Sequence, residues 1–149
     1  MNIYRISSSQ YVEDLSGAGG LFASGRWHKK GTRLVYFSET VALAKLEKLA
    51  NSPTGVPKSQ KLLVLSLPDT LKTEILEWRH LDNKWSSIPP SLTNYELVSE
   101  WLEKSTSLLL KVPSIHSPFE YNFLMNPDHP DIKLTSKQIL NLEFDSRIK

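Results

Sequence analysis

The sequence predicts a single domain of the α+β class. The chain has 149 residues, a length that suits one domain. Its 40% hydrophobic and 23% charged residues are typical of a globular protein. Strand-like segments outnumber helical ones, and the two kinds do not alternate as they would in a doubly wound parallel sheet.

The first half of the chain contains three strand-like segments and one helical segment. Residues 2–7 alternate between apolar and polar side chains, and residues 33–38 have an apolar centre, so both are expected to be strands. A helix is expected at 40–51, where a hydroxyl can cap its start and a loop rich in proline and glycine follows. Residues 61–67 are almost wholly apolar and predict a buried strand.

The second half contains four weaker strand signals and one helix. The strands are expected at residues 74–78, 108–112, 121–125 and 139–145. The segment 78–90 is irregular and ends in two prolines. Ser91 or Thr93 can then cap a helix that runs to about Lys104. No repeat, low-complexity segment or linker divides the chain, so residues 1–149 are expected to form one domain.

Composition excludes several classes of protein. The absence of cysteine excludes a disulfide scaffold, a thiolate zinc site and a cysteine nucleophile. The formal charge of +2, from 18 basic and 16 acidic residues, is too balanced to indicate direct nucleic-acid binding. The amino terminus lacks the pattern of a signal peptide, and the longest apolar runs are far shorter than the roughly 20 residues of a membrane span. We therefore expect a soluble cytoplasmic protein with no membrane contact.

Five of the six glycines lie between Gly17 and Gly31 and predict a long loop. Arg26 lies in this loop, beside Trp27, where its guanidinium could bind a phosphate or carboxylate through two hydrogen bonds. A surface arginine stacked on Trp27 is the alternative. The glycine spacing matches neither the dinucleotide-binding GxGxxG pattern nor a P-loop.

Glu47 is an acid on or beside the apolar face of the first helix. That face is expected to contain Val41, Ala42, Leu43, Leu46, Leu49 and Ala50. On a helical wheel Glu47 lies between Leu43 and Ala50, whereas Lys45 and Lys48 point elsewhere. A buried carboxylate needs a cation, a ligand or a pocket. Alternatively, Glu47 lies at the edge of the face and reaches water.

The remaining candidates give weaker signals. Tyr36 could stack on a flat ring or simply fill the core. Ser114 ends a strand and exposes a hydroxyl, but it lacks the Gly-x-Ser-x-Gly elbow, and His116 is too close in sequence to suggest a triad. The segment 126–131 could bind a metal, but its prolines and asparagine more simply make a turn. Since the histidines lack metal-site spacing, no metal site is expected.

Taken together, these segments resemble the RES domain, the toxin half of the bacterial RES–Xre toxin–antitoxin modules. The matching pieces follow one another along nearly the whole chain: Tyr4-Arg5, Asp14–Gly20, Ser24–His28, Val35–Glu39, Ala42–Glu47, Val112–Ser114, Glu120–Asp131 and Phe144–Arg147. Each piece is weak alone, but the ordered set is specific. His28 departs from the asparagine that is frequent there, and residues 51–61 and 78–90 carry little signal.

The resemblance implies a fold like that of diphtheria-toxin-type ADP-ribosyltransferases, with a split, mostly antiparallel β-core around an NAD⁺ cleft. The arginine, glutamate and serine that name the family correspond to Arg26, Glu47 and Ser114. In this scheme Glu47 stabilises the positive charge that develops on the ribose and binds a ribose hydroxyl. Arg26 holds the pyrophosphate or the adjoining ribose, and Ser114 bonds to ligand or orients Glu47.

Three further residues complete the expected site. Tyr36 would stack on the nicotinamide ring, and His28 and Asn126 are weaker candidates for the pocket wall.

The resemblance also implies a function: the toxin depletes NAD⁺ by hydrolysis or phosphorolysis of the nicotinamide–ribose bond. NAD⁺ is then the substrate, and no cofactor or metal is required. The implied partner is an Xre-type antitoxin that plugs the cleft, and a homodimer within the complex is possible.

Other functions remain open. Mono-ADP-ribosylation of a host protein would use the same four residues, which are Arg26, Tyr36, Glu47 and Ser114. A non-catalytic module could bind a partner through its aromatic residues, which include Trp27, Trp78, Trp85 and Trp101. A nuclease toxin would need a basic groove or clustered acids, and the sequence shows neither.

Overall fold

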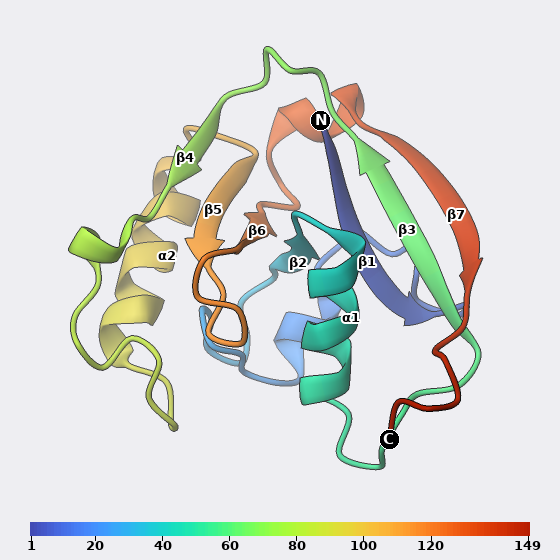
Figure 1. Ribbon diagram of the computed structural model, residues 1–149. Coiled ribbons are helices and arrows are strands. Elements are labelled where there is room, and N and C mark those ends of the chain that lie inside the picture. Colours follow the sequence, from blue (N-terminus) through green and yellow to red (C-terminus); the bar gives the residue numbers. More distant parts are fainter.

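The computed structural model describes residues 1–149 and contains one seven-stranded sheet and two α-helices (Figure 1). The strands are β1 (Asn2–Ser8), β2 (Val35–Ser38), β3 (Gln60–Ser66), β4 (Thr73–Ile75), β5 (Leu109–Pro113), β6 (Tyr121–Met125) and β7 (Ser136–Leu142). The α-helices are α1 (Val41–Ala50) and α2 (Leu92–Lys104), and the 3₁₀ helices are η1 (Ala18–Leu21), η2 (Trp78–His80) and η3 (Pro130–Leu134). The predicted α+β class is confirmed.

The sheet is split between β1 and β2. Its order is β4-β5-β6-β2-β1-β3-β7, and only the β4–β5 pair is parallel. Strand β1 pairs with β3 along its whole length but with β2 only where Tyr4 faces Ser38. The two halves therefore diverge, and α1 lies in front of the sheet where they separate (Figure 1). This is the split, mostly antiparallel core that the sequence resemblance implied.

The strand register places a set of polar side chains on the face that carries both helices. Tyr4 is opposite Ser38, and Ser38 is opposite Asn122, so all three point to one face. On that face Ala44 of α1 packs on Ile6 in one cluster, while Trp101 of α2 packs in another.

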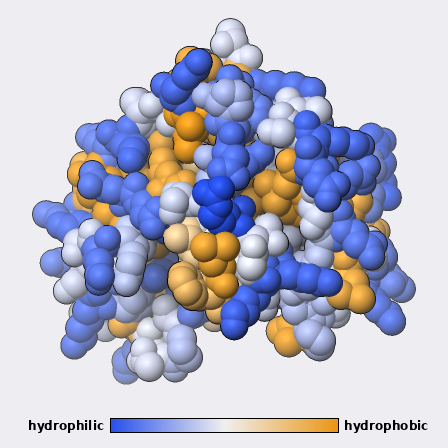
Figure 2. Space-filling view, turned by 180° about the vertical axis from the view of Figure 1, so that it is seen from behind, coloured by the Kyte–Doolittle hydropathy of each residue, from blue (hydrophilic) through white to orange (hydrophobic).

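The opposite face of the central strands contributes to the largest core cluster: Ile3, Val12, Val35, Phe37, Leu63, Leu65, Leu67, Leu108, Leu109, Phe123 and Met125. Apolar side chains reach the back of the molecule only in separate patches (Figure 2).

Helix α1 begins as predicted, but fewer of its apolar side chains are buried than the sequence predicts. The hydroxyl of Thr40 accepts the backbone N–H of Leu43 at 3.0 Å and caps the helix. Leu43 and Ala44 are buried, whereas Leu46 is 40% exposed. The predicted burial of Ala42, Leu46 and Ala50 is wrong, because the helix spans the opening of the sheet and only one stripe touches it.

Two strands differ most from their predicted bounds. Strand β7 covers Ser136–Leu142, not 139–145, because it pairs with β3 from Ser136 onward. It is an edge strand with mostly polar residues, so its sequence pattern is weak. Strand β4 ends at Ile75, and Trp78 begins η2. No helix of the chain is both long enough and apolar enough to cross a membrane.

Candidate active site

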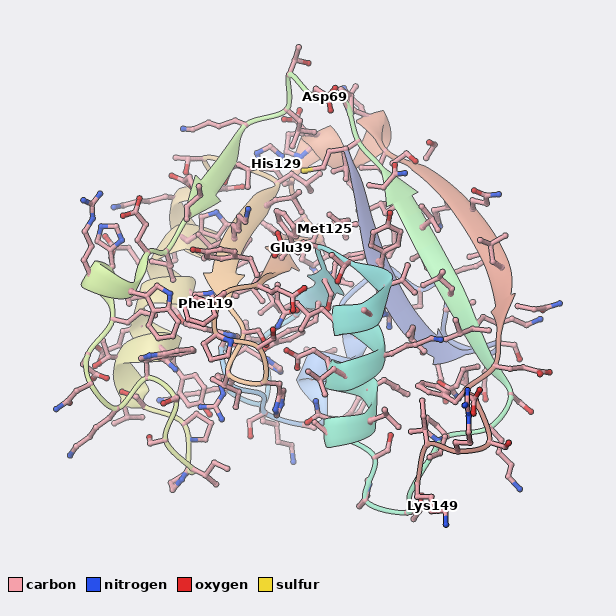
Figure 3. The ribbon with its side chains drawn as sticks, viewed as in Figure 1. Glu39, Asp69, Phe119, Met125, His129 and Lys149 are labelled. Atoms are coloured by element: carbon pink, nitrogen blue, oxygen red, sulfur yellow. The ribbon has the colours of Figure 1, made fainter.

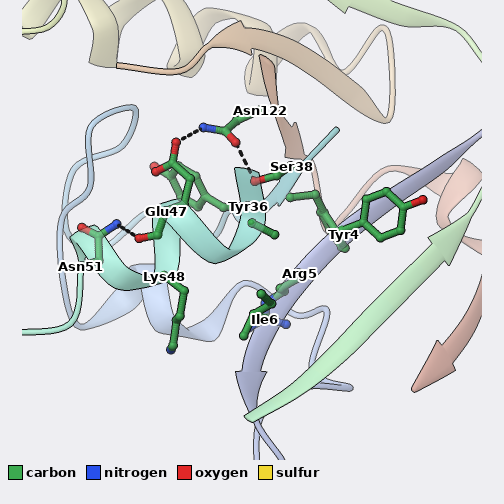
Figure 4. A pocket seen from close by; sticks show the side chains of 11 residues that line it. Tyr4, Arg5, Ile6, Tyr36, Ser38, Glu47, Lys48, Asn51 and Asn122 are labelled. Carbon is green, nitrogen blue, oxygen red and sulfur yellow. Dashed lines mark hydrogen bonds between the residues drawn. The ribbon is translucent and has the colours of Figure 1, made fainter. Parts of the chain in front are cut away.

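Two adjoining cavities open beside α1. The larger, of about 410 Å³, is lined by Arg26, Trp27, Ile88, Ile115 and His116, among others, and is called the Arg26 cavity. The smaller, of about 220 Å³, is lined by Arg5, Ser38 and Lys48, among others, and is called the Arg5 cavity (Figure 4). Both cavities are also lined by Tyr36, Glu47, Asn51 and Asn122.

The Glu47 carboxylate lies at the junction of these cavities and is held by two donors. The Ser114 hydroxyl donates to Oε1 at 2.8 Å, and the Asn122 side-chain amide donates to the same oxygen at 2.6 Å. Asn122 is itself oriented by Ser38, whose hydroxyl donates to Asn122 Oδ1 at 2.7 Å (Figure 4). Oε1 is therefore fixed by protein groups, and Oε2 is left without a hydrogen bond.

The Ser114 hydroxyl is fully used within the protein. Its oxygen accepts the backbone N–H groups of His116 at 3.1 Å and Ser117 at 3.2 Å. Its one hydrogen is donated to Glu47. This geometry favours the second of the two predicted roles of Ser114, the orientation of Glu47.

The Tyr36 side chain is positioned by a hydrogen bond to His28. The His28 Nε2 is 2.9 Å from the carbonyl of Ala23, which can only accept, so Nε2 carries the hydrogen. In the neutral ring Nδ1 then accepts the Tyr36 hydroxyl, at 2.6 Å. Burial lowers the pKa of His28 and raises the pKa of Tyr36, so both side chains are neutral at pH 7. His28 lines neither of the two cavities and supports Tyr36 instead.

Gly25 is required by this arrangement. A Cβ atom at this position would lie 2.8 Å from the Tyr36 hydroxyl and 2.9 Å from His28 Cε1. Any larger residue would have to displace the ring that lines both cavities.

Arg26 is anchored by the irregular segment 78–90, to which the sequence assigned no role. Its Nη1 donates to the carbonyls of Trp85 at 3.1 Å and Ser87 at 2.9 Å. The Trp85 ring stacks on Trp27, with ring centroids 6.0 Å apart. Arg26 forms no ion pair with Glu47. Burial lowers the pKa of Arg26, and the nearby carboxylate partly opposes this effect.

Asn126, a predicted pocket residue, lies outside both cavities. Its amide donates to Ser105 Oγ at 3.2 Å, and its Oδ1 accepts the N–H of Asp128 at 3.0 Å. It therefore shapes the turn after β6. Asn122, at the other end of the same strand, is the asparagine that reaches Glu47 and was missed. Asn122 is a polar residue within an otherwise apolar strand, and this pattern could have indicated a buried side chain with a hydrogen-bonding role.

Arg5 and Lys48 were also missed, and both line the Arg5 cavity. The prediction that Lys48 points away is wrong, because α1 turns this side chain toward β1. Burial lowers the pKa of Arg5, an effect that Asp14 partly offsets. Burial and then the charge of Arg5 lower the pKa of Lys48. Neither residue forms an ion pair with a carboxylate, although Arg5 Nη1 donates to the carbonyls of Asp14 at 2.6 Å and Tyr11 at 3.5 Å.

The His28–Tyr36 pair predicts a pH dependence of stability. Since the pKa of His28 is lowered in the folded protein, the unfolded chain binds more protons between that pKa and its ordinary value of about 6.5. The free energy of unfolding should therefore fall as the pH is lowered through this window. His28→Gln should show a smaller fall between about pH 7 and 5, as measured by urea denaturation. If the free energy of unfolding depended equally on pH in the two proteins, the lowered pKa of His28 in the folded state would be contradicted.

Comparisons with known proteins agree on one family. The RES domain model matches residues 2–146. The chain is 38% identical over 151 residues to Toxin Res of Pseudomonas putida, covering 99% of each protein. It is 32% identical over 141 residues to the Prs ADP-ribosylating toxin of Sphingobium, covering 92% of this chain and 88% of that protein.

A solved structure agrees in fold. A chain in the crystal structure of the M. tuberculosis MbcT–MbcA toxin–antitoxin complex superposes with a TM-score of 0.73 at 15% identity, covering 95% of this chain and 83% of that one. With the family model matching almost every residue, this chain belongs to the RES domain family.

Proposed function

We propose that this protein is the toxin of a toxin–antitoxin pair and that it cleaves the nicotinamide–ribose bond of NAD⁺, with water or phosphate as the acceptor. The observation that carries the proposal is the Glu47 carboxylate, fixed by Ser114 and Asn122 where two cavities meet.

The carboxylate suits this chemistry. When the bond to nicotinamide breaks, positive charge develops at C1 of the ribose, and a fixed adjacent carboxylate stabilises it. Because Oε1 of Glu47 is already held by two donors, it need not reorganise during the reaction. Oε2 remains for a ribose hydroxyl or for the charged centre.

The two cavities suit a ligand that carries both a diphosphate and a flat ring. Arg5 and Lys48 supply positive charge in the smaller cavity, where we place the diphosphate. Tyr36 borders both cavities and is placed against the nicotinamide ring. Arg26 lies in the larger cavity, and its N–H groups other than Nη1 can still bind ligand oxygens. In this arrangement Arg26 binds the ribose that adjoins the diphosphate.

An antitoxin partner is part of the proposal. Two relatives carry the word toxin in their names, and the structural neighbour is a toxin–antitoxin complex. Exposed apolar side chains offer a docking surface. Ile88, in the wall of the Arg26 cavity, is 88% exposed. Phe119 is 94% exposed and lies on the loop between β5 and β6, which also carries the cavity residues Ile115 and His116 (Figure 3). We propose an Xre-type antitoxin that covers this opening, within a complex in which the toxin forms a homodimer.

ADP-ribosyl transfer to a host protein is the second candidate. It is supported by the name of the Sphingobium relative, an ADP-ribosylating toxin. Mass spectrometry of host proteins separates the two: a modified target without bulk loss of NAD⁺ indicates transfer, whereas loss of NAD⁺ without a modified target indicates destruction.

The first test is nicotinamide release from NAD⁺ by the purified protein, with and without phosphate. Glu47→Gln should lower kcat by about 10²–10³-fold, since a fixed negative charge is lost at the reacting centre. Glu103→Gln, an exposed glutamate of α2, is the matched control and should behave as wild type. Circular dichroism checks that each variant is folded.

Two outcomes would refute this function. No release by the wild-type protein in either buffer would exclude NAD⁺ cleavage. Release by Glu47→Gln at the wild-type rate would exclude Glu47 as the catalytic centre.

The placement of the diphosphate gives a separate prediction. Lys48→Ala should raise KM for NAD⁺ by roughly tenfold, in line with the loss of a charge-assisted hydrogen bond, and should change kcat much less. Lys45→Ala is the control on the same helix, because Lys45 lies over the Phe144 ring and lines neither cavity. Equal effects of the two variants on KM would show that Lys48 does not bind the substrate.

A further inference from the structure

We propose that His116 is the general base that accepts a proton from the attacking water, which makes hydrolysis the reaction of this site. The inference rests on the proposed function and identifies the acceptor that the function leaves open.

The imidazole of His116 lies beside the oxygen of Glu47 that has no hydrogen bond. His116 Nε2 lies 3.7 Å from Glu47 Oε2, and the ring lines the Arg26 cavity. This distance is too long for a direct hydrogen bond, but one oxygen atom at about 2.8 Å from both atoms fits between them. Such an oxygen lies beside the centre whose charge Glu47 stabilises. The His116 side chain is 30% exposed, so a proton taken up there can pass to solvent.

The His116 ring is also free of hydrogen bonds within the protein. The rings of His28, His80 and His129 all make hydrogen bonds to other groups of the protein. The His116 ring makes none, although its backbone N–H is fixed by Ser114 Oγ. One hydroxyl thus places both the Glu47 carboxylate and the loop that carries the free imidazole.

Three other titratable groups line the Arg26 cavity together with His116: Glu47 on α1, Arg26 on the loop before β2 and Tyr36 on β2. A further carboxylate, Glu120, lies on the same loop as His116. Of the carboxylates, Glu120 is bound by Ser117 and Thr40. Glu47 is the acid whose free oxygen faces the imidazole.

The reaction balances with these groups alone. The C1–N bond of the ribose breaks, and its electron pair leaves with neutral nicotinamide. The water oxygen bonds to C1, and its proton passes to Nε2 of His116 and then to solvent. The products are ADP-ribose, nicotinamide and one proton. An anionic nucleophile such as azide reacts at C1 without losing a proton, so it needs no base.

Because water must lose a proton and azide need not, the two nucleophiles test the role of His116. His116→Asn should lower NAD⁺ hydrolysis by about 10²-fold, the effect usual for loss of a general base. Added sodium azide should restore nicotinamide release in this variant and form ADP-ribosyl azide, identified by mass spectrometry. Azide should not restore Glu47→Gln, which has lost the stabilising charge. His80→Asn replaces an exposed histidine outside both cavities and should retain hydrolysis.

The results that would refute the role of His116 differ from the result that would refute NAD⁺ cleavage. Hydrolysis by His116→Asn at the wild-type rate would overturn the proposal. Equal loss of the water and azide reactions, in both His116→Asn and His116→Gln, would mean that the histidine only positions Glu47 and would also overturn it. Absence of nicotinamide release by the wild-type protein would instead refute the proposed function, and the role of His116 with it.

Discussion

The paired hydrogen bonds from Ser114 and Asn122 to Glu47 Oε1 join three distant parts of the chain. Ser114 follows β5 and lies 67 residues from Glu47, whereas Asn122 is on β6, 75 residues away. A partly buried carboxylate is costly unless polar groups compensate for lost water, and these two donors do so. The position of α1 over the split in the sheet and the register of β5 with β6 are both needed to bring them together.

Local sequence pattern was sufficient for most of the fold. The strands and the two helices follow from apolar runs, alternation and capping hydroxyls, which act over a few residues. Glu47 could be singled out because a carboxylate on an apolar helix face is unusual. The exposure of Leu46 could not be foreseen, because it depends on α1 lying across an opening and not on a continuous core.

The rest of the candidate site depends on long-range geometry. Asn122 contributes only because β6 pairs with β2 so that Asn122 is opposite Ser38. Arg5 and Lys48 come together only where β1 diverges from β2. The anchor of Arg26 consists of two backbone carbonyls, which every residue possesses, so the segment 78–90 carries no side-chain signature of its role. Family resemblance supplied Tyr36 and Ser114, which chemistry alone did not favour.

We propose that Ser114 acts on the reaction through the Glu47 carboxylate. A double-mutant cycle on kcat for nicotinamide release tests this claim directly. Ser114→Ala should lower kcat in the wild-type background and have almost no further effect in the Glu47→Gln background. If the two substitutions lowered kcat by independent factors that multiply, Ser114 would act on the substrate or elsewhere, and the account of the site would be contradicted.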